Sequence, residues 1–125
     1  MEDFVNYEIA NKLKNLGFEE STYHYYNIDD IRYCRDDYPS DHNGDPLREF
    51  EISAPTISQV LKWLRDKFSL HISQKPYACK DGLMWMYEIR KFNKRIVFVI
   101  ANKTGFVEEE EASLAGIEHA IDNLI

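Results

Sequence analysis

The stretch 83–101 constrains the fold of this chain more than any other part of its sequence. Its first half alternates apolar and polar side chains, as a half-buried strand does, and one face carries Leu83, Trp85, Tyr87 and Ile89. Its second half is an unbroken apolar run, 96–101, typical of a central strand that is covered on most of its sides. Because Asn93-Lys94 between them can turn the chain, the stretch predicts a β-hairpin that forms the floor for three helices.

The first of these helices is predicted at about 2–16, where apolar residues recur at helical spacing. Acidic residues at its start suit the positive end of the helix dipole. Gly17 should end the helix in the left-handed conformation, and Phe18 should then fold back onto Leu13.

The second and third helices follow from equally local signals. Thr56 and Gln59 form a capping box ahead of an apolar stripe, which predicts a helix at about 57–68. Four consecutive glutamates at 108–111 open the last helix, at the end where the dipole favours carboxylates.

The remaining segments carry weaker patterns. Short strands are predicted at 23–27 and 70–74, and a turn is predicted at 102–105. The segment 34–49 is polar, is broken by proline and glycine, and has no apolar period, so we expect one long irregular loop there. Loops of that length in so small a chain tend to be functional or mobile.

These elements predict an α+β fold in which a three-stranded antiparallel meander carries three helices. The expected order is helix, loop, helix, three strands, helix, within a single domain over 1–125. We expect one core, formed by Leu61, Leu64, Trp85, Ile96, Phe98, Ile117 and Ile121.

Composition and cysteine usage limit the compartment. With 125 residues and 44% hydrophobic content the chain is long enough to close a core, yet no apolar run approaches the ~18 residues of a membrane span. The first residues lack the basic start and apolar middle of a signal peptide. Cys34 and Cys79 lie far apart in the sequence, so we expect two reduced thiols in a cytoplasmic protein without membrane contact.

Charge is unevenly distributed along the chain. Residues 1–51 carry 13 acidic and 5 basic side chains, a net −8, residues 52–105 carry 3 acidic and 10 basic, a net +7, and residues 106–125 carry 6 acidic and no basic, a net −6. One interpretation is that the acidic segments lie against the basic middle and neutralise it. The other is a basic face directed at an acidic partner.

Three further motifs stand out: the Ala54-Pro55-Thr56 step before Trp63-Leu64-Arg65, the paired aromatic strands, and a Glu110-Glu111-Ala112 helix start. Together these motifs resemble those of small prophage-encoded proteins of gut bacteria. The opening helix that ends in Leu16-Gly17-Phe18 is also similar. The resemblance spans most of the chain except 34–49. The resemblance supports the α+β fold and implies a prophage origin. Its motifs are packing motifs without catalytic content.

The polar segment 34–49 contains residue types that can bind metal ions. Read as a calcium loop with Gly44 at its sixth position, it would need ligands where Pro39 and Phe50 stand, so the pattern fails. Cys34 and His42 are suitable zinc ligands, but no second pair lies near them in the sequence. The sequence therefore predicts a solvated acidic loop, no metal and no cofactor.

The sequence predicts neither an activated nucleophile nor a phosphate-binding loop. His71 and Cys79 have no orienting third group. The five glycines are all isolated, so no glycine-rich phosphate loop is present.

Two hypotheses about function remain. The first is a non-catalytic accessory protein that binds another protein through its tyrosine-rich segment, because tyrosine offers large contact area at low entropic cost. The candidate residues are Tyr23, Tyr25, Tyr26, Tyr33 and Tyr38, although these tyrosines could equally cover the sheet. The alternative is nucleic-acid binding by the basic segment 52–105, where Lys91, Lys94, Arg95 and Lys103 gather near aromatic residues; a pI near 5.0 makes nucleic acid the less favoured partner.

Overall fold

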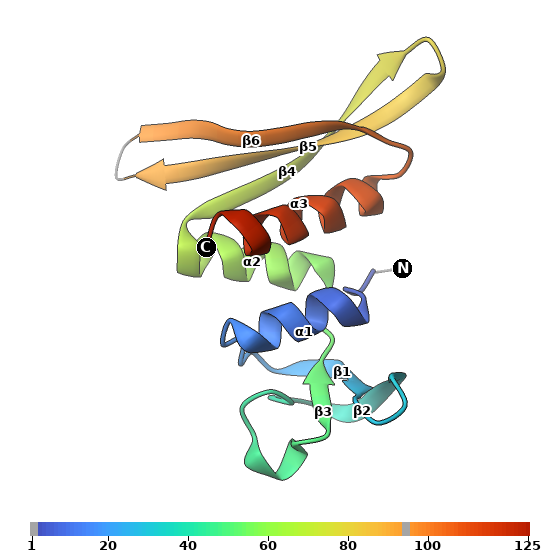
Figure 1. The fold of residues 1–125 in the computed structure, drawn as a ribbon, viewed down its shortest axis with the longest axis vertical. Helices are drawn as coiled ribbons and strands as arrows, with labels where there is room; N and C mark the ends of the chain where they lie inside the picture. The colour runs from blue at the N-terminus through green and yellow to red at the C-terminus, as the bar shows by residue number, and fades with distance from the viewer. Residues whose placement is uncertain (1–2, 94–95) are drawn as a thin grey trace. The chain divides into compact units, whose positions relative to one another are not determined.

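The computed structural model describes residues 3–93 and 96–125. The chain divides into two compact units, Met1–Thr56 and Ile57–Ile125, and each is described here by itself (Figure 1). The expectation of a single domain over 1–125 stays a prediction. Among the described helices, none combines the length and the apolar character needed to cross a membrane.

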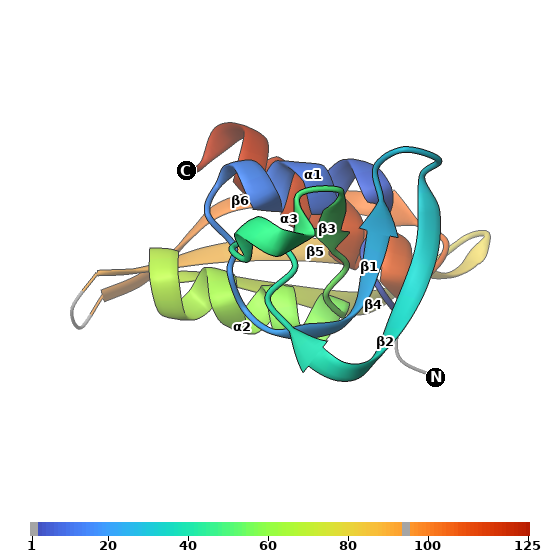
Figure 2. The ribbon, with the colours of Figure 1, turned by 90° about the horizontal axis from the view of Figure 1, so that it is seen from below.

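The first unit is a small sheet with one helix. Its elements are α1 (Tyr7–Asn15), β1 (Thr22–Asn27), β2 (Arg32–Ser40), the 3₁₀ helix η1 (Pro46–Arg48) and β3 (Glu51–Ser53). The strands are antiparallel in the order β2-β1-β3, and α1 contacts β3. Figure 2 shows β2 running beside β1 in this unit.

Local chemistry sets both ends of α1. The Asn6 side chain accepts a hydrogen bond from the Ile9 amide at 2.9 Å, so the helix begins five residues later than the sequence suggested. Gly17 has a φ of +89°, and the Phe18 amide donates to the Leu13 carbonyl at 3.0 Å, which is the predicted left-handed helix end. Phe18 and Leu13 are both fully buried.

The predicted loop at 34–49 is wrong over its first half. Residues up to Ser40 belong to β2, and η1 occupies Pro46–Arg48. The sequence of β2 lacks a strand pattern because β2 lies at the edge of its sheet, where charged residues and a proline such as Pro39 are tolerated. Between the pairs Thr22–Ser40 and His24–Arg35 the register shifts, and extra residues of β2 lie opposite Tyr23.

The second unit is the predicted meander with two helices. Its elements are α2 (Ile57–Phe68), β4 (Leu70–Cys79), β5 (Gly82–Asn93), β6 (Ile96–Phe106) and α3 (Glu109–Asn123). All pairs are antiparallel in the order β4-β5-β6, and α2 and α3 lie against one face of the sheet (Figure 1). The α+β class and the bounds of α2 are as predicted, and α1 belongs to the first unit.

The helix-facing side of β5 is the predicted one, since Tyr87 and Ile89 are buried. Leu64 and Ile117 are fully buried, and Leu61, Trp85 and Ile121 are partly buried. Phe98 is wrongly predicted as core, because 44% of it is exposed. The reason is that β6 is an edge strand and β5 is the central one.

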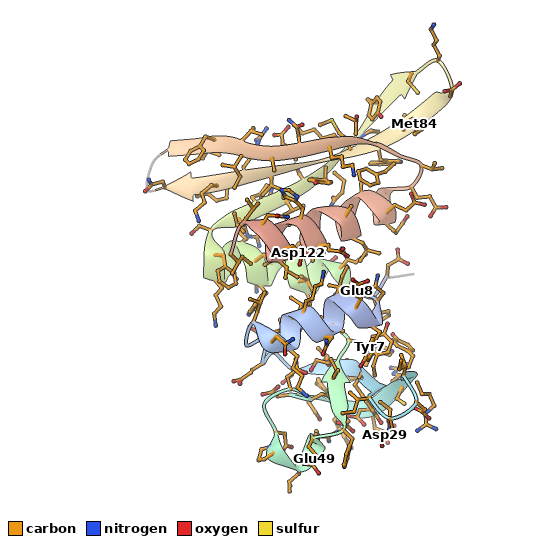
Figure 3. The ribbon with its side chains drawn as sticks, viewed as in Figure 1. Tyr7, Glu8, Asp29, Glu49, Met84 and Asp122 are labelled. Atoms are coloured by element: carbon orange, nitrogen blue, oxygen red, sulfur yellow. The ribbon has the colours of Figure 1, made fainter. Side chains whose placement is uncertain are left out.

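Two further boundaries differ from the predictions. The expected turn at 102–105 lies inside β6, and β4 continues to Cys79, well beyond 74. The side chain of Ile96 and the second residue of the predicted Asn93-Lys94 turn lie outside the described residues. Figure 3 shows the side chains of this sheet, with Met84 on β5 and Asp122 on α3.

Candidate partner-binding surface

The five candidate tyrosines do not form one surface. Residues opposite each other on neighbouring strands share a face, so the pairs Tyr26–Tyr33 and Tyr25–Cys34 place Tyr26 and Tyr25 on opposite faces of the first sheet. Tyr26 is structural, because its hydroxyl donates to the Val5 carbonyl at 2.8 Å.

Tyr33 belongs to an aromatic cluster on the same face as Tyr26. Its ring stacks on the His24 ring with centroids 5.2 Å apart. The Phe4 ring contacts both, with its centroid 4.2 Å from that of His24 and 5.8 Å from that of Tyr33. Burial and the neighbouring Tyr26 raise the pKa of Tyr33 to about 12, so its hydroxyl stays a neutral donor. Burial, and then the charge of Arg35, lowers the pKa of His24, so this ring is uncharged at neutral pH.

Three of the tyrosines remain accessible. The exposed fractions are 46% for Tyr23, 45% for Tyr33 and 78% for Tyr38. The guanidinium of Arg35 lies over the Tyr23 ring at 5.8 Å, and Arg35 is paired with His24, which stacks on Tyr33. We call the exposed residues Tyr23, Tyr33, Arg35 and Tyr38 of β1 and β2 the tyrosine surface. By strand alternation Tyr23 lies on the face of Tyr25 and Tyr33 on the face of Tyr26, so the name covers both faces of this edge of the sheet.

This surface is held by backbone pairing rather than by a loop. Tyr23 lies in β1 opposite the extra residues of β2, which include Tyr38. The sequence pointed to the tyrosines but not to Arg35. The signal for Arg35 is that residues 33 and 35 alternate onto one face of β2, a strand that the sequence pattern did not predict.

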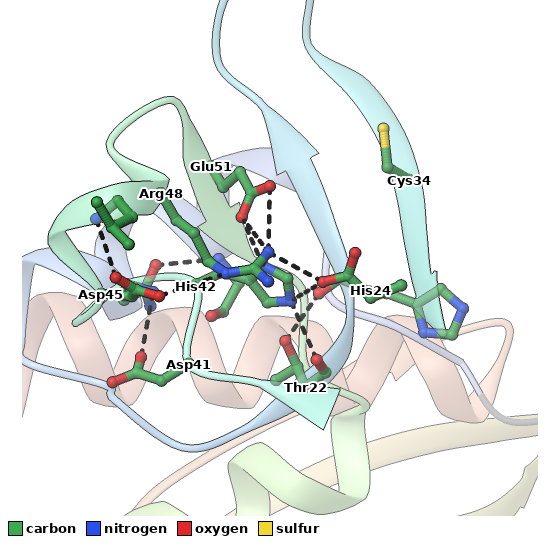
Figure 4. A network of polar contacts seen from close by, with 12 residues as sticks. Thr22, His24, Cys34, Asp41, His42, Asp45, Arg48 and Glu51 are labelled. Carbon is green, nitrogen blue, oxygen red and sulfur yellow. Dashed lines mark hydrogen bonds and ion pairs between the residues drawn. The ribbon is translucent and has the colours of Figure 1, made fainter. Parts of the chain in front are cut away.

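The face of the sheet that carries Tyr25 also holds a buried polar network (Figure 4). His42 is fully buried, its Nδ1 lies 2.8 Å from Glu51 Oε2, and its Nε2 lies 3.1 Å from the Thr22 carbonyl. The Arg48 Nη1 donates to Asp36 Oδ2 at 3.1 Å and to Glu51 Oε2 at 3.0 Å. No pattern in the sequence indicates that these residues converge.

The network bears on the metal hypothesis. Its carboxylates and imidazole are metal-ligand types, but the guanidinium of Arg48 already lies between them as the counter-cation. The ring of Tyr25 stacks on His42 at 4.6 Å, and Cys34 donates weakly to the Arg32 carbonyl at 3.5 Å. No cluster of three metal-ligand side chains was found among residues 3–93 and 96–125.

The candidate nucleophile pair is also separated. His71 and Cys79 lie eight residues apart on β4, which is about 26 Å at ~3.3 Å per residue.

The basic segment is partly neutralised within the second unit. Glu88 accepts from Arg90 at 2.6 Å and from Lys75 at 3.2 Å. These two bonds hold the pKa of Glu88 below its ordinary range, Arg90 contributing more, so the carboxylate stays ionised between two cations. Trp63, an aromatic residue of the basic segment 52–105, is buried.

A groove lies along α3 in this unit. Its volume is about 340 Å³, and it is lined by Tyr87, Lys103, Ala115, Glu118, His119, Asp122 and Asn123. Lys103 was expected in a turn near Lys91. It lies instead within β6 and pairs with Tyr87 of β5, which is four residues before Lys91 on that strand. Two of the cations expected together, Lys94 and Arg95, lie outside the described residues.

No protein-family model, curated protein or solved structure matches the chain.

Proposed function

We propose that this chain is a small non-catalytic accessory protein, of prophage origin and cytoplasmic, that binds another protein through the tyrosine surface. The observation that carries the proposal is the exposure of Tyr23, Tyr33 and Tyr38 on hydrogen-bonded strands. Rigid aromatic side chains lose little conformational entropy on binding, and tyrosine and arginine are the residues most enriched at interface hot spots.

The charge of the first unit indicates the kind of partner. This unit contains all of residues 1–51 and their net charge of −8, while Arg35 lies over the exposed ring of Tyr23. A protein with a positively charged rim around an apolar or aromatic centre would complement it.

Capture from cell extract tests this proposal. The tagged wild type is compared with a variant that carries Tyr23→Ser, Tyr33→Ser and Tyr38→Ser, and circular dichroism checks that both are folded. A control variant carries Lys62→Ser, Arg65→Ser and Lys67→Ser, three exposed positions of α2 in the other unit. We expect a protein that is retained by the wild type and the control and lost by the tyrosine variant; equal retention by all three would refute the tyrosine surface.

Nucleic-acid binding by 52–105 is the alternative. The feature in its favour is the sheet face opposite the helices, where cations and aromatic residues such as Lys75, Tyr77, Arg90 and Phe92 alternate with apolar ones. The feature against it is Glu88, which already pairs two of those cations.

Titration with labelled single- and double-stranded oligonucleotides at low salt separates the two functions. Binding that weakens steeply with salt is the signature of phosphate contacts. We expect no binding, and micromolar affinity lost on changing Lys75 and Arg90 to Ser would replace the protein-binding proposal with the alternative.

A further inference from the structure

His42 occupies an unusual position for a histidine. Its side chain is fully buried between strands β1, β2 and β3 and the segment 41–48. The ring contacts Glu51 through Nδ1 and the Thr22 carbonyl through Nε2, and Nε2 also lies 3.3 Å from Asp36 Oδ2. Each ring nitrogen therefore faces an oxygen.

Both of these oxygens act as acceptors. A backbone carbonyl has no proton to give, and an ionised carboxylate only accepts. A neutral imidazole carries one N–H, so it can satisfy one of the two contacts and must direct a lone pair at the other oxygen. The observed distances of 2.8 Å and 3.1 Å are both hydrogen-bond distances, which requires a proton on each nitrogen or on Glu51.

Arg48 decides where that proton lies. Its Nη1 donates to the same Glu51 oxygen at 3.0 Å and also to Asp36, and its Nε lies 3.6 Å from Asp45. A guanidinium stabilises ionised carboxylates, which disfavours a proton on Glu51. Arg48 itself approaches the ring at 3.5 Å, farther than either carboxylate, so the nearest charges to the imidazole are negative.

We propose that His42 is held as the doubly protonated imidazolium in the folded first unit, and that this proton fastens the segment 41–48 to the sheet as a pH-sensitive clamp. The charged and titratable groups that face it are Asp36 on β2, Arg48 on η1, Glu51 on β3 and the stacked Tyr25 on β1. With the imidazolium, the charges of His42 and Arg48 balance those of Asp36 and Glu51. Without it, a lone pair meets either the Glu51 carboxylate or the Thr22 carbonyl.

The direction of the pH effect follows from the number of protons that the His42 ring carries. The clamped form carries one more proton on the His42 ring than the neutral form does. Raising the pH therefore favours release of the segment 41–48, and lowering the pH favours the clamp.

Nitrogen NMR of the ¹⁵N-histidine-labelled full chain at pH 7 tests the proposal directly. The variant His42→Gln assigns the His42 signals among the four histidines, and His71, whose ring contacts Phe92, is the internal reference. We expect both His42 nitrogens to resonate as protonated imidazolium nitrogens. A His42 ring with one protonated nitrogen in the folded protein would overturn the proposal.

A pH series tests the clamp. Amide signals of 41–48 should shift or broaden in the wild type between pH 6 and pH 9. In Glu51→Gln they should change little, because a glutamine amide can either donate to or accept from the ring. Wild-type signals that stay unchanged over this range would refute the clamp, and this reading needs no variant.

Discussion

Tyr26 joins the β1 strand to the start of the chain through one hydrogen bond, from its hydroxyl to the Val5 carbonyl. Tyr26→Phe removes that bond and leaves a buried carbonyl unpaired, so we expect the free energy of unfolding to fall by about 1 kcal/mol. Urea denaturation at pH 7 measures it. Tyr23→Phe is the control, since this half-exposed side chain should change stability by less than about 0.5 kcal/mol; equal losses would show that the Val5 bond contributes nothing.

Phe98 lies on an edge strand with 44% of its surface exposed. Phe98→Ala should therefore cost less than about 1.5 kcal/mol, below the 3–5 kcal/mol typical of a buried phenylalanine. Ile117→Ala, at a fully buried position of α3, should cost about 2–5 kcal/mol. Thermal and urea unfolding of the two variants give the comparison, and a larger loss for Phe98→Ala would mean that its exposed face is covered in solution.

Single residues show why the candidate site was only half predictable. The tyrosines were visible because composition alone marks them. The buried network was not, because Asp36, His42, Arg48 and Glu51 follow no helical or strand period and meet only after β2 and β3 pair with β1.

Elements with strong local signals were predicted well. The bounds of α2 and the end of α1 follow from an apolar stripe and from Gly17, both of which act within a few residues. The strand β2 was missed because edge strands tolerate charge and proline. The apolar run of β6 indicated a strand correctly, but strand order depends on long-range pairing, which the run alone does not encode.

The close approach of α3 to its sheet depends on Gly116. A Cβ placed there would lie 2.9 Å from Ile72 Cγ2 and 3.2 Å from Tyr87 Cγ. Gly116→Val should lower the free energy of unfolding by about 1–3 kcal/mol through overpacking, although valine is the better helix former. Urea denaturation measures this loss.

Ala115→Val is the matched control for this helix. Ala115 lines the groove of about 340 Å³, where a larger side chain has room. We expect a loss below about 1 kcal/mol, close to the difference in helix propensity. If Ala115→Val were the more damaging change, the packed face of α3 would have to be reassigned.

Considered over the whole chain, the charge distribution separates the two units. Residues 57–125 carry 10 basic and 9 acidic side chains, a net +1, because the acidic start of α3 belongs to the same unit as the basic sheet it contacts. The second unit is therefore nearly neutral as a whole. The negative charge of the molecule is concentrated in the first unit, which also carries the tyrosine surface.

The most direct test is the affinity of the purified chain for the protein it captures, measured by calorimetry for single alanine variants. We expect Tyr33→Ala and Arg35→Ala each to weaken binding at least tenfold, a loss of about 1.4 kcal/mol or more, as hot-spot residues do. Phe92→Ala, an exposed aromatic position of the second unit, should leave the affinity unchanged. Unchanged affinity in Tyr33→Ala and Arg35→Ala, with a loss in Phe92→Ala, would contradict the account.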